Sequence, residues 1–544
     1  MRNGTNRTFL VGFSLSSLLL IQAAPSRGMT HHWSQVFDGY GVDDERCVAV
    51  DWAGNAILTG SFGGTADFGG GPLTGAGASD VFVAKYDTRG VHLWSQRFGD
   101  ASRQYSAGVA VDAFGNVVVT GYFQGTVDFG AGPLTSAGGY DIFVAKFDPS
   151  GTHLWSKRFG DAGGQYRSEI TVDASGNVLL TGSFEGTMDL GGGPLTSAGG
   201  YDIFVAKLDP TGAHLWSERF GDADRQICTA VTADASGNVL LTGYGGVDFG
   251  GGTLANFVAK LDPAGGHLWS RSSNNATPTS VAVDDASNVI VTGLGGGMDF
   301  GGGVLTGEIF LVKFDASGAH VWSQAFPVTE TYWGATVAVD VYGNVLLTGP
   351  FSGWTFFGGE TFMTWIDDTD MYIAKFDPAG VHLWSQSFYE SNHVHGTYQI
   401  SDCIAADPFG NIIVTGEPGN DVDFGGGALS NVGALFLVKF GPIGTAVADG
   451  PVGYHLHVNA YPNPFNPSTT ITYSIPQSGF VQLAVYNVRG RLVRTLVNTR
   501  QPAGDYTVTW RGRDSGNSPV ASGVYFIRLE SGGQVQVRKS TLIE

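Results

Sequence analysis

A unit of 53 to 62 residues recurs along most of this chain, and this repeat limits the possible folds more than any other feature. Each unit carries a Trp-Ser pair, at Trp33, Trp94, Trp155, Trp216, Trp269, Trp322 and Trp384. Each also carries an Asp-x-x-Gly-Asn turn, a Thr-Gly pair and a lysine, and the turn departs from this pattern once, at Ser287. Because so short a unit cannot bury its own apolar faces, the units must pack against one another.

The second unit shows what is repeated. Its β-branched and aromatic runs lie at residues 108–112, 116–123, 142–148 and 153–159, with turn residues between them. Four short strands in each of seven units predict an all-β, seven-bladed β-propeller.

The phase of the repeat indicates how the ring closes. The repeat begins near Met29 with a lone fourth strand, and the last unit ends near 440 without one. We expect the N-terminal strand to complete the seventh blade, which removes an open sheet edge and gives a propeller over residues 29–440. An open solenoid is the alternative, but it does not explain the matching deficits at the two ends.

Composition excludes several functional classes. The chain has 83 glycines, 12% aromatic residues and a net charge of −20. A nucleic-acid-binding face needs basic residues, and a disordered chain has fewer aromatic ones. We therefore expect a turn-rich globular protein that binds no nucleic acid.

The first 26 residues have the pattern of a secretory signal. Arg2 and Arg7 precede an apolar run over residues 9–21, and small residues follow it. A retained N-terminal anchor is the alternative. No other stretch reaches the ~20 apolar residues of a spanning helix, so we expect an extracellular or outer-membrane-surface protein without a transmembrane span.

The repeat resembles the bacterial SBBP β-propeller repeat. The resemblance rests on the D-x-x-G-N-x-x-x-T-G core and the F-V-A-K-x-D-x-x-G-x-x-x-W-S ending of each unit. It implies an exported or surface protein and no particular chemistry.

Residues 441–455 are predicted to be a linker, and residues 456–544 are predicted to form a separate Ig-like sandwich. From His455 onward there are nine Lys or Arg against four Asp or Glu, so this part has a charge of +5 and the rest of the chain −25. A change of sign of this size marks a domain boundary.

The C-terminal segment resembles the FlgD-type Ig-like domain, which serves as a sorting signal in type IX (Por) secretion. The resemblance rests on the block Tyr461, Pro462, Asn463, Pro464, Phe465, Asn466, Pro467 and on two later segments, VYNVRGRLVRTL and SGVYFIRL. It implies that the type IX machinery is the partner of this domain, which is then cut off or exchanged for a lipid anchor. A plain Ig-like spacer is the alternative.

Departures from the repeat indicate where a ligand would bind. The sixth unit replaces its Gly-rich loop with an aromatic segment, and the connections on either side of this unit add aromatic, acidic and histidine residues on the same face. The candidate ligand-binding residues are Trp333, Trp354, Phe356, Trp365, Asp367, Asp368, Glu390 and His393. Exposed rings beside carboxylates suit a glycan or a protein surface. The alternative is that these aromatics fill a gap above the sixth blade.

No cofactor and no metal are expected. The seven turn aspartates, from Asp51 to Asp407, would form a ring that suits calcium, but we favour their bonding to backbone N–H groups within their own turns. Glu390, His393 and His395 match no helical zinc motif. Cys47 and Cys403 occupy equivalent positions in the first and last units, which ring closure makes neighbours. Two alternatives stay open, namely two buried free thiols or a disulfide between these two units.

Three functions remain open for what we expect to be a monomer. The first is a non-enzymatic propeller that binds a glycan or a protein. The second is a polysaccharide hydrolase or lyase that uses Asp367, Asp368, Glu390 or His393 as acid and base. The third is a purely structural surface protein.

Overall fold

A computed structural model describes residues 29–38, 46–272, 275–330, 334–365, 367–389, 398–419, 421–430, 435–442, 456–475, 478–487, 491–531 and 534–543. The expected signal segment and most of the expected linker lie outside these residues. Within them every regular element is a strand, and none forms a helix long and apolar enough to cross a membrane.

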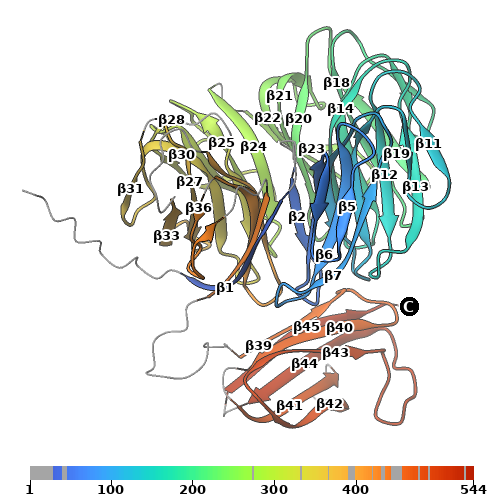
Figure 1. The fold of residues 1–544 in the computed structure, drawn as a ribbon. Coiled ribbons are helices and arrows are strands. Elements are labelled where there is room, and N and C mark those ends of the chain that lie inside the picture. The colour runs from blue at the N-terminus through green and yellow to red at the C-terminus, as the bar shows by residue number, and fades with distance from the viewer. Residues whose placement is uncertain are drawn as a thin grey trace, which may run out of the picture.

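In the described residues, seven four-stranded antiparallel sheets form the blades of a propeller (Figure 1). The first three blades are β2 (Cys47–Val50), β3 (Ala56–Phe62), β6 (Asp80–Tyr86), β7 (His92–Phe98); β8 (Gln104–Val111), β9 (Val117–Phe123), β12 (Asp141–Phe147), β13 (His153–Phe159); and β14 (Gln165–Val172), β15 (Val178–Phe184), β18 (Asp202–Leu208), β19 (His214–Phe220). The next two are β20 (Ile227–Ala233), β21 (Val239–Asp248), β22 (Thr253–Leu261), β23 (His267–Arg271); and β24 (Ala276–Val283), β25 (Val289–Gly295), β26 (Ile309–Phe314), β27 (His320–Phe326). The last two are β29 (Thr336–Val339), β30 (Val345–Phe356), β32 (Asp370–Phe376), β33 (His382–Phe388); and β34 (Gln399–Ala406), β35 (Ile412–Pro418), β38 (Leu435–Pro442), β1 (Met29–Phe37). The predicted seven-bladed architecture is confirmed.

The N-terminal strand closes the ring as predicted. β1 pairs with β38 from Met29↔Pro442 to Phe37↔Leu435. β38 therefore runs to Pro442, so Gly441 and Pro442, which the sequence assigns to the linker, are part of the last blade. Trp33 of β1 then donates its indole N–H to the Thr88 carbonyl of the first blade at 3.0 Å.

Six of the seven repeated tryptophans are hydrogen-bonded to the next blade in the described residues. Trp94, Trp155, Trp216, Trp269 and Trp322 donate to a carbonyl in the following blade, as Trp33 does. The apolar cores between blades are built from the second and third strands, whose side chains are buried on both faces. The repeated Trp therefore helps to hold neighbouring blades together.

The Gly-rich loops form small hairpins beside several blades. They are β4 (Thr65–Asp67) with β5 (Pro72–Thr74), β10 (Thr126–Asp128) with β11 (Pro133–Thr135), β16 (Thr187–Asp189) with β17 (Pro194–Thr196), and β36 (Asp421–Val422) with β37 (Leu429–Ser430). In the first of them Gly70 lies so close to His92 that a Cβ would meet its Cε1 at 2.4 Å. The glycines therefore let the loop pack against the fourth strand.

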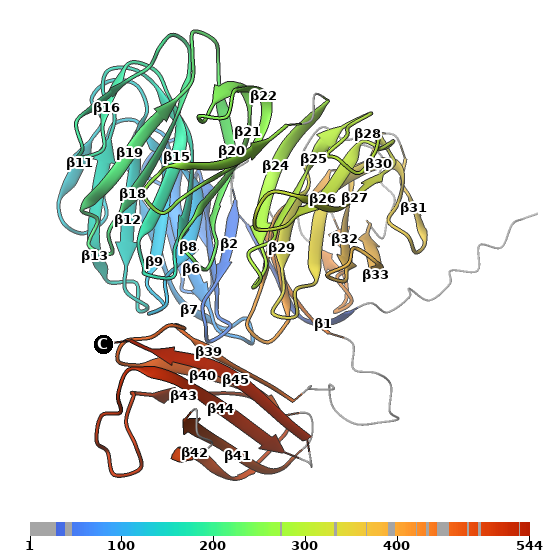
Figure 2. The same cartoon turned by 180° about the vertical axis from the view of Figure 1, so that it is seen from behind.

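The C-terminal part is a sandwich of two sheets. One sheet contains β39 (His457–Tyr461), β40 (Thr469–Ile475) and β43 (Gly504–Trp510). The other contains β42 (Leu492–Gln501), β41 (Gly479–Asn487), β44 (Gly523–Ser531) and β45 (Gln534–Leu542). Phe465, Trp510 and Tyr525 lie in the core between the sheets. Figures 1 and 2 show β39, β40 and β45 on the side toward the propeller, and β41 and β42 on the far side.

Candidate functional site

The unusual segment of the sixth blade forms a small sheet of its own. β30 continues past its blade and pairs with β31 (Thr361–Met363) and β28 (Val328–Glu330). Side chains along this extension alternate in burial. Thr355, Phe357 and Phe362 are buried, and the Phe357 ring lies 4.3 Å from the Tyr372 ring. These two phenylalanines fill space above the blade, as the alternative interpretation predicts.

The other face of this hairpin is an exposed apolar surface. Trp354 pairs directly with Met363, and Phe356 lies two residues further along the same face. Their exposed fractions are 45%, 79% and 40%, and Trp365 beyond β31 is 61% exposed. We call Trp354, Phe356, Met363 and Trp365 the blade-six patch. The hairpin lies at the rim of the propeller, away from the Ig-like domain (Figures 1 and 2).

The remaining residues predicted for this site divide into two groups. Asp367 is exposed beside the patch, whereas Asp368 is buried, 6% exposed, with its backbone N–H bonded to the Trp365 carbonyl. Trp333, Glu390 and His393 lie outside the described residues. Of the two predicted aspartates, only Asp367 is therefore exposed and able to bind a hydroxyl or a cationic group.

The seven turn aspartates are bonded inside the fold. In the second blade, Asp112 accepts the backbone N–H groups of Phe114 and Asn116 and the amide of Asn116. Its other contact is Lys146, whose Nζ lies 2.8 Å from Asp112 Oδ2 and also donates to the Pro210 carbonyl of the next blade. Every copy from Asp51 to Asp407 repeats the turn bonds and the lysine pair.

The predicted role of these aspartates in their own turns is therefore confirmed. A lysine ammonium lies beside each carboxylate, where a cation would otherwise bind. In the described residues no group of three or more His, Cys, Asp or Glu is arranged to hold a metal ion.

The turn face of the propeller carries the Ig-like domain. Trp52 of the first blade stacks on Tyr461, and Tyr342 of the sixth lies edge-on to His457 at 5.6 Å. Arg538 of β45 lies 3.4 Å from Asp285 of the fifth blade. The unusual residues predicted from the sequence belong to the opposite face, and these contacts were not predicted. The sequence does contain a signal of this contact. The residue after the turn aspartate is Trp52 in the first blade, whereas it is Ala113, Ala174 or Ala235 in blades two to four.

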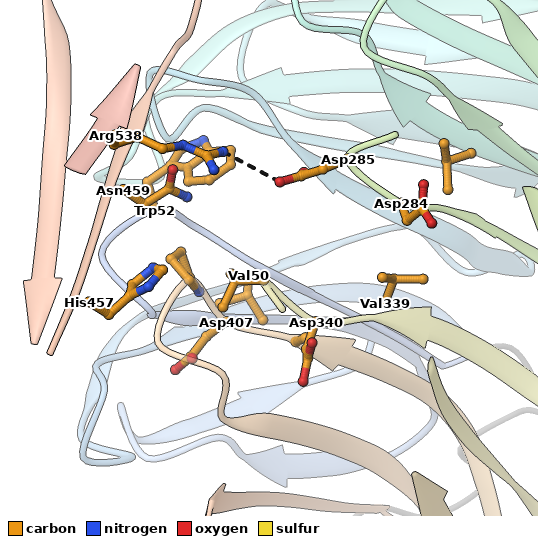
Figure 3. A pocket seen from close by; sticks show the side chains of 14 residues that line it. Val50, Trp52, Asp284, Asp285, Val339, Asp340, Asp407, His457, Asn459 and Arg538 are labelled. Atoms are coloured by element: carbon orange, nitrogen blue, oxygen red, sulfur yellow. Dashed lines mark hydrogen bonds and ion pairs between the residues drawn. The ribbon is translucent and has the colours of Figure 1, made fainter. Parts of the chain in front are cut away.

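The two domains enclose a pocket of about 220 Å³ at the centre of this face (Figure 3). Asp340 and Asp407 line it from the propeller, and His457, Asn459 and Arg538 line it from the Ig-like domain. Burial, and secondly the charge of Arg538, lowers the pKa of His457. The imidazole is therefore neutral at physiological pH.

A second, larger cavity of about 580 Å³ lies near the ring closure. It is lined by His32 of β1, by Lys439 of β38 and by Asp505 of the Ig-like domain. Burial and the charge of Asp407 raise the pKa of Asp505 to about 6, although a hydrogen bond to Ser474 and the charge of Lys439 oppose the shift. This carboxyl group can therefore change its protonation near neutral pH.

A tyrosine cluster lies on the face opposite the Ig-like domain, and it was not predicted from the sequence. Ring centroids 5.1 to 5.9 Å apart connect Tyr105, Tyr122, Tyr140, Tyr166 and Tyr201. Arg225 of the fourth blade lies over the Tyr201 ring at 5.5 Å. The sequence does contain a signal of this cluster. Tyr122 of the second blade occupies the position that is Ser61 in the first blade and Ser183 in the third.

The proline-rich block at 461–467 is built into the Ig-like domain. Asn463 donates to the Lys539 carbonyl and accepts from the Thr541 N–H, and the Phe465 ring lies 5.2 Å from Trp510. The peptide bonds before Pro462, Pro464 and Pro467 are cis, and the last of them follows Asn466. Tyr461 at the end of β39 faces the propeller instead.

The chain is similar to several known proteins. Residues 468–534 match the FlgD Ig-like domain family. Over 436 residues the chain is 22% identical to the WD repeat-containing protein L264 of Acanthamoeba polyphaga mimivirus, covering 60% of this chain and 31% of that protein. The chain thus spans less than a third of the length of this relative.

Two solved structures show the same general kind of similarity. The Dos1 propeller is 9% identical and matches 78% of this chain and 98% of its own, with a TM-score of 0.39. PorZ, a surface component of the type IX secretion system of Porphyromonas gingivalis, is 10% identical and matches 94% and 100%, with a TM-score of 0.17. At these values neither similarity supports an inference about the ligand or partners of this chain.

Proposed function

We propose that this protein is an exported surface propeller that binds a glycan or a protein through the blade-six patch. The observation that carries the proposal is the exposure of Trp354, Phe356, Met363 and Trp365 together on one hairpin. Large apolar side chains gathered on a monomer's surface mark binding sites. Trp and Tyr rings cover the apolar faces of sugars and anchor protein partners.

The blade can present these residues without losing its own core. Phe357 and Phe362, on the other face of the hairpin, already supply the packing that the blade needs. The exposed rings of Trp354 and Phe356 face outward, and the exposed Asp367 can accept hydrogen bonds from hydroxyl or ammonium groups.

The patch is tested by replacing Trp354 and Trp365 with Ala in the full chain and probing a glycan array. We expect binding to fall at least tenfold while the thermal midpoint stays within error. Leu154→Ala is the matched control, because Leu154 is 48% exposed on a different blade. Undiminished glycan binding by the double variant would exclude the patch, and loss of binding in the control would point to a general effect.

We also propose that the Ig-like domain directs export through the type IX machinery and that the repeat is of the SBBP type. The match to the FlgD Ig-like family and the block at 461–467 support the first part. Deleting residues 456–544 in a host with type IX secretion should keep the protein inside the outer membrane. Trp354→Ala should be exported normally, and export of the deleted form would contradict the sorting role.

A further inference from the structure

Two cysteines meet where the propeller ring closes. Cys47 begins β2 in the first blade, and Cys403 lies in β34 of the seventh, 356 positions later in the chain. Their Sγ atoms are 3.2 Å apart, and Cys403 Sγ also lies 3.6 Å from the Val48 carbonyl oxygen. Both residues are partly buried, whereas Cys228 in the fourth blade is fully buried.

Cysteine occurs at this position only in the two blades that closure makes neighbours. Both residues lie four positions before the turn aspartate of their blade. The other five blades have different residues there, namely Gly108, Glu169, Ala230, Ser280 and Thr336. A preference for cysteine as a small apolar packing residue would not select these two blades alone.

An ion pair fixes the backbones on either side of the two thiols. Arg46 precedes Cys47, is 5% exposed and donates to Asp402, the residue before Cys403, at 2.9 Å. A second bond from Arg46 reaches Glu417 at 2.5 Å. Since a buried, paired guanidinium resists displacement, the two strands are held at a fixed spacing.

We propose that Cys47 and Cys403 form a disulfide that closes the propeller ring covalently. A disulfide has an S–S length of about 2.05 Å, so the two sulfur atoms must approach by roughly 1.2 Å. Small rotations of two side chains can supply this movement without shifting the strands.

The oxidant in this step is another disulfide, either small or on a thiol oxidoreductase. A thiolate of the pair attacks one sulfur of the oxidant and expels a thiolate, and the second cysteine then attacks the mixed disulfide. Two protein thiols thereby lose two protons and two electrons, and the oxidant is reduced to two thiols. The hydrogen bond between the two thiols lowers the pKa of Cys403, which favours the thiolate form of Cys403 in the first step.

The test uses the full chain refolded with reduced and oxidised glutathione, then alkylated and digested without reduction. Mass spectrometry should find a cross-linked peptide that joins Cys47 to Cys403, with Cys228 alkylated. Alkylation of both seam cysteines, or a bond to Cys228, would overturn the proposal. The biological setting rests on the proposed export, but the experiment supplies its own oxidant and requires no glycan binding.

Thermal unfolding gives a second measurement. Reduction should lower the midpoint of the oxidised wild type by about 5 °C, because a cross-link over so long a loop restricts the unfolded chain. Cys228→Ser should show the same drop, and the double variant Cys47→Ser, Cys403→Ser should show none. An identical midpoint for oxidised and reduced wild type would contradict covalent closure, and the mass spectrum decides if the double variant does not fold.

Discussion

The indole of Trp52 stacks on the phenol ring of Tyr461, with the ring centroids 3.6 Å apart and the planes at 19°. This contact joins the first propeller blade to the first strand of the Ig-like domain. Burial raises the pKa of Tyr461 to about 12, with smaller contributions from Asp112 and Asp173 of the neighbouring blades. The basic Ig-like domain thus sits on the turn face of the propeller, and the propeller covers the first aromatic side chain of its proline-rich block.

Trp52→Ala should weaken the docking of the Ig-like domain by about 2 kcal/mol, because it removes both the stacking and the buried area. Hydrogen exchange of a peptide covering residues 456–461 should become faster, and small-angle scattering should show a larger radius of gyration. Trp354→Ala, which removes an exposed indole from the rim, serves as the control. Unchanged exchange in Trp52→Ala would mean that this stack does not hold the domains together.

Docking should weaken as the pH rises through about 6. Burial raises the pKa of Asp505 from its ordinary value of 3.8 to about 6 in the folded protein. The stabilisation by this group is therefore fully present below about 3.8 and is lost as the pH rises through 6. At most roughly 3 kcal/mol is involved.

Charged and titratable groups around Asp505 also affect how docking depends on pH, so the experiment needs a variant that removes only this carboxyl group. Asp407 favours its protonated form, Lys439 opposes it, and His32 lines the same cavity. Burial lowers the pKa of His32, so its contribution has the opposite sign and is lost as the pH falls. Asp505→Asn removes the carboxyl group, and scattering should then no longer show a larger radius at pH 7.5 than at pH 5. A persistent pH effect in this variant would assign the effect to another group.

Lys146→Met should destabilise the propeller by about 3–5 kcal/mol in thermal or denaturant unfolding. It leaves the Asp112 carboxylate buried, 1% exposed, without its ammonium partner. It also removes the bond to the Pro210 carbonyl of the next blade. Arg89→Met, in a pair whose arginine is 78% exposed, should cost less than about 1 kcal/mol. Equal effects of the two substitutions would contradict a structural role for the buried pairs.

Gly70→Ala should destabilise the first blade by about 1–3 kcal/mol, because the new Cβ would overlap the His92 ring. His92→Ala removes the ring and should relieve most of this strain. The double variant is therefore expected to be more stable than the sum of the two single changes predicts. Simple additivity of the unfolding free energies would show that the loop and the ring are not in conflict.

The seven blades and their closure could be predicted because the same turn and strand residues recur in each of seven units. Counterparts of Asp112, Asn116 and Lys146 recur in every unit, and the repeat begins with a lone fourth strand and ends with a unit that lacks one. The structure adds the reason for the lysine, which bonds its own blade's turn and, in the second blade, the next blade's carbonyl. Spacing alone cannot show a contact between residues 34 positions apart in different strands.

The candidate site could be predicted only in part. Alternation within β30 and β31 decides that Phe357 is buried while Trp354 and Phe356 are exposed, and this depends on the register between two strands. Binding by the blade-six patch stays a prediction. The contact between Trp52 and Tyr461 depends on how two domains meet, and no periodic pattern within either domain encodes it.

The pairing of β1 with β38 has a consequence for the order of events during synthesis. The first strand of the propeller has no partner until a segment more than 390 residues later has emerged. Until then the backbone groups of β1 are unpaired, and the edge of β38 stays open to other chains until β1 pairs with it. The ring can therefore close only after nearly all of the propeller has been synthesised.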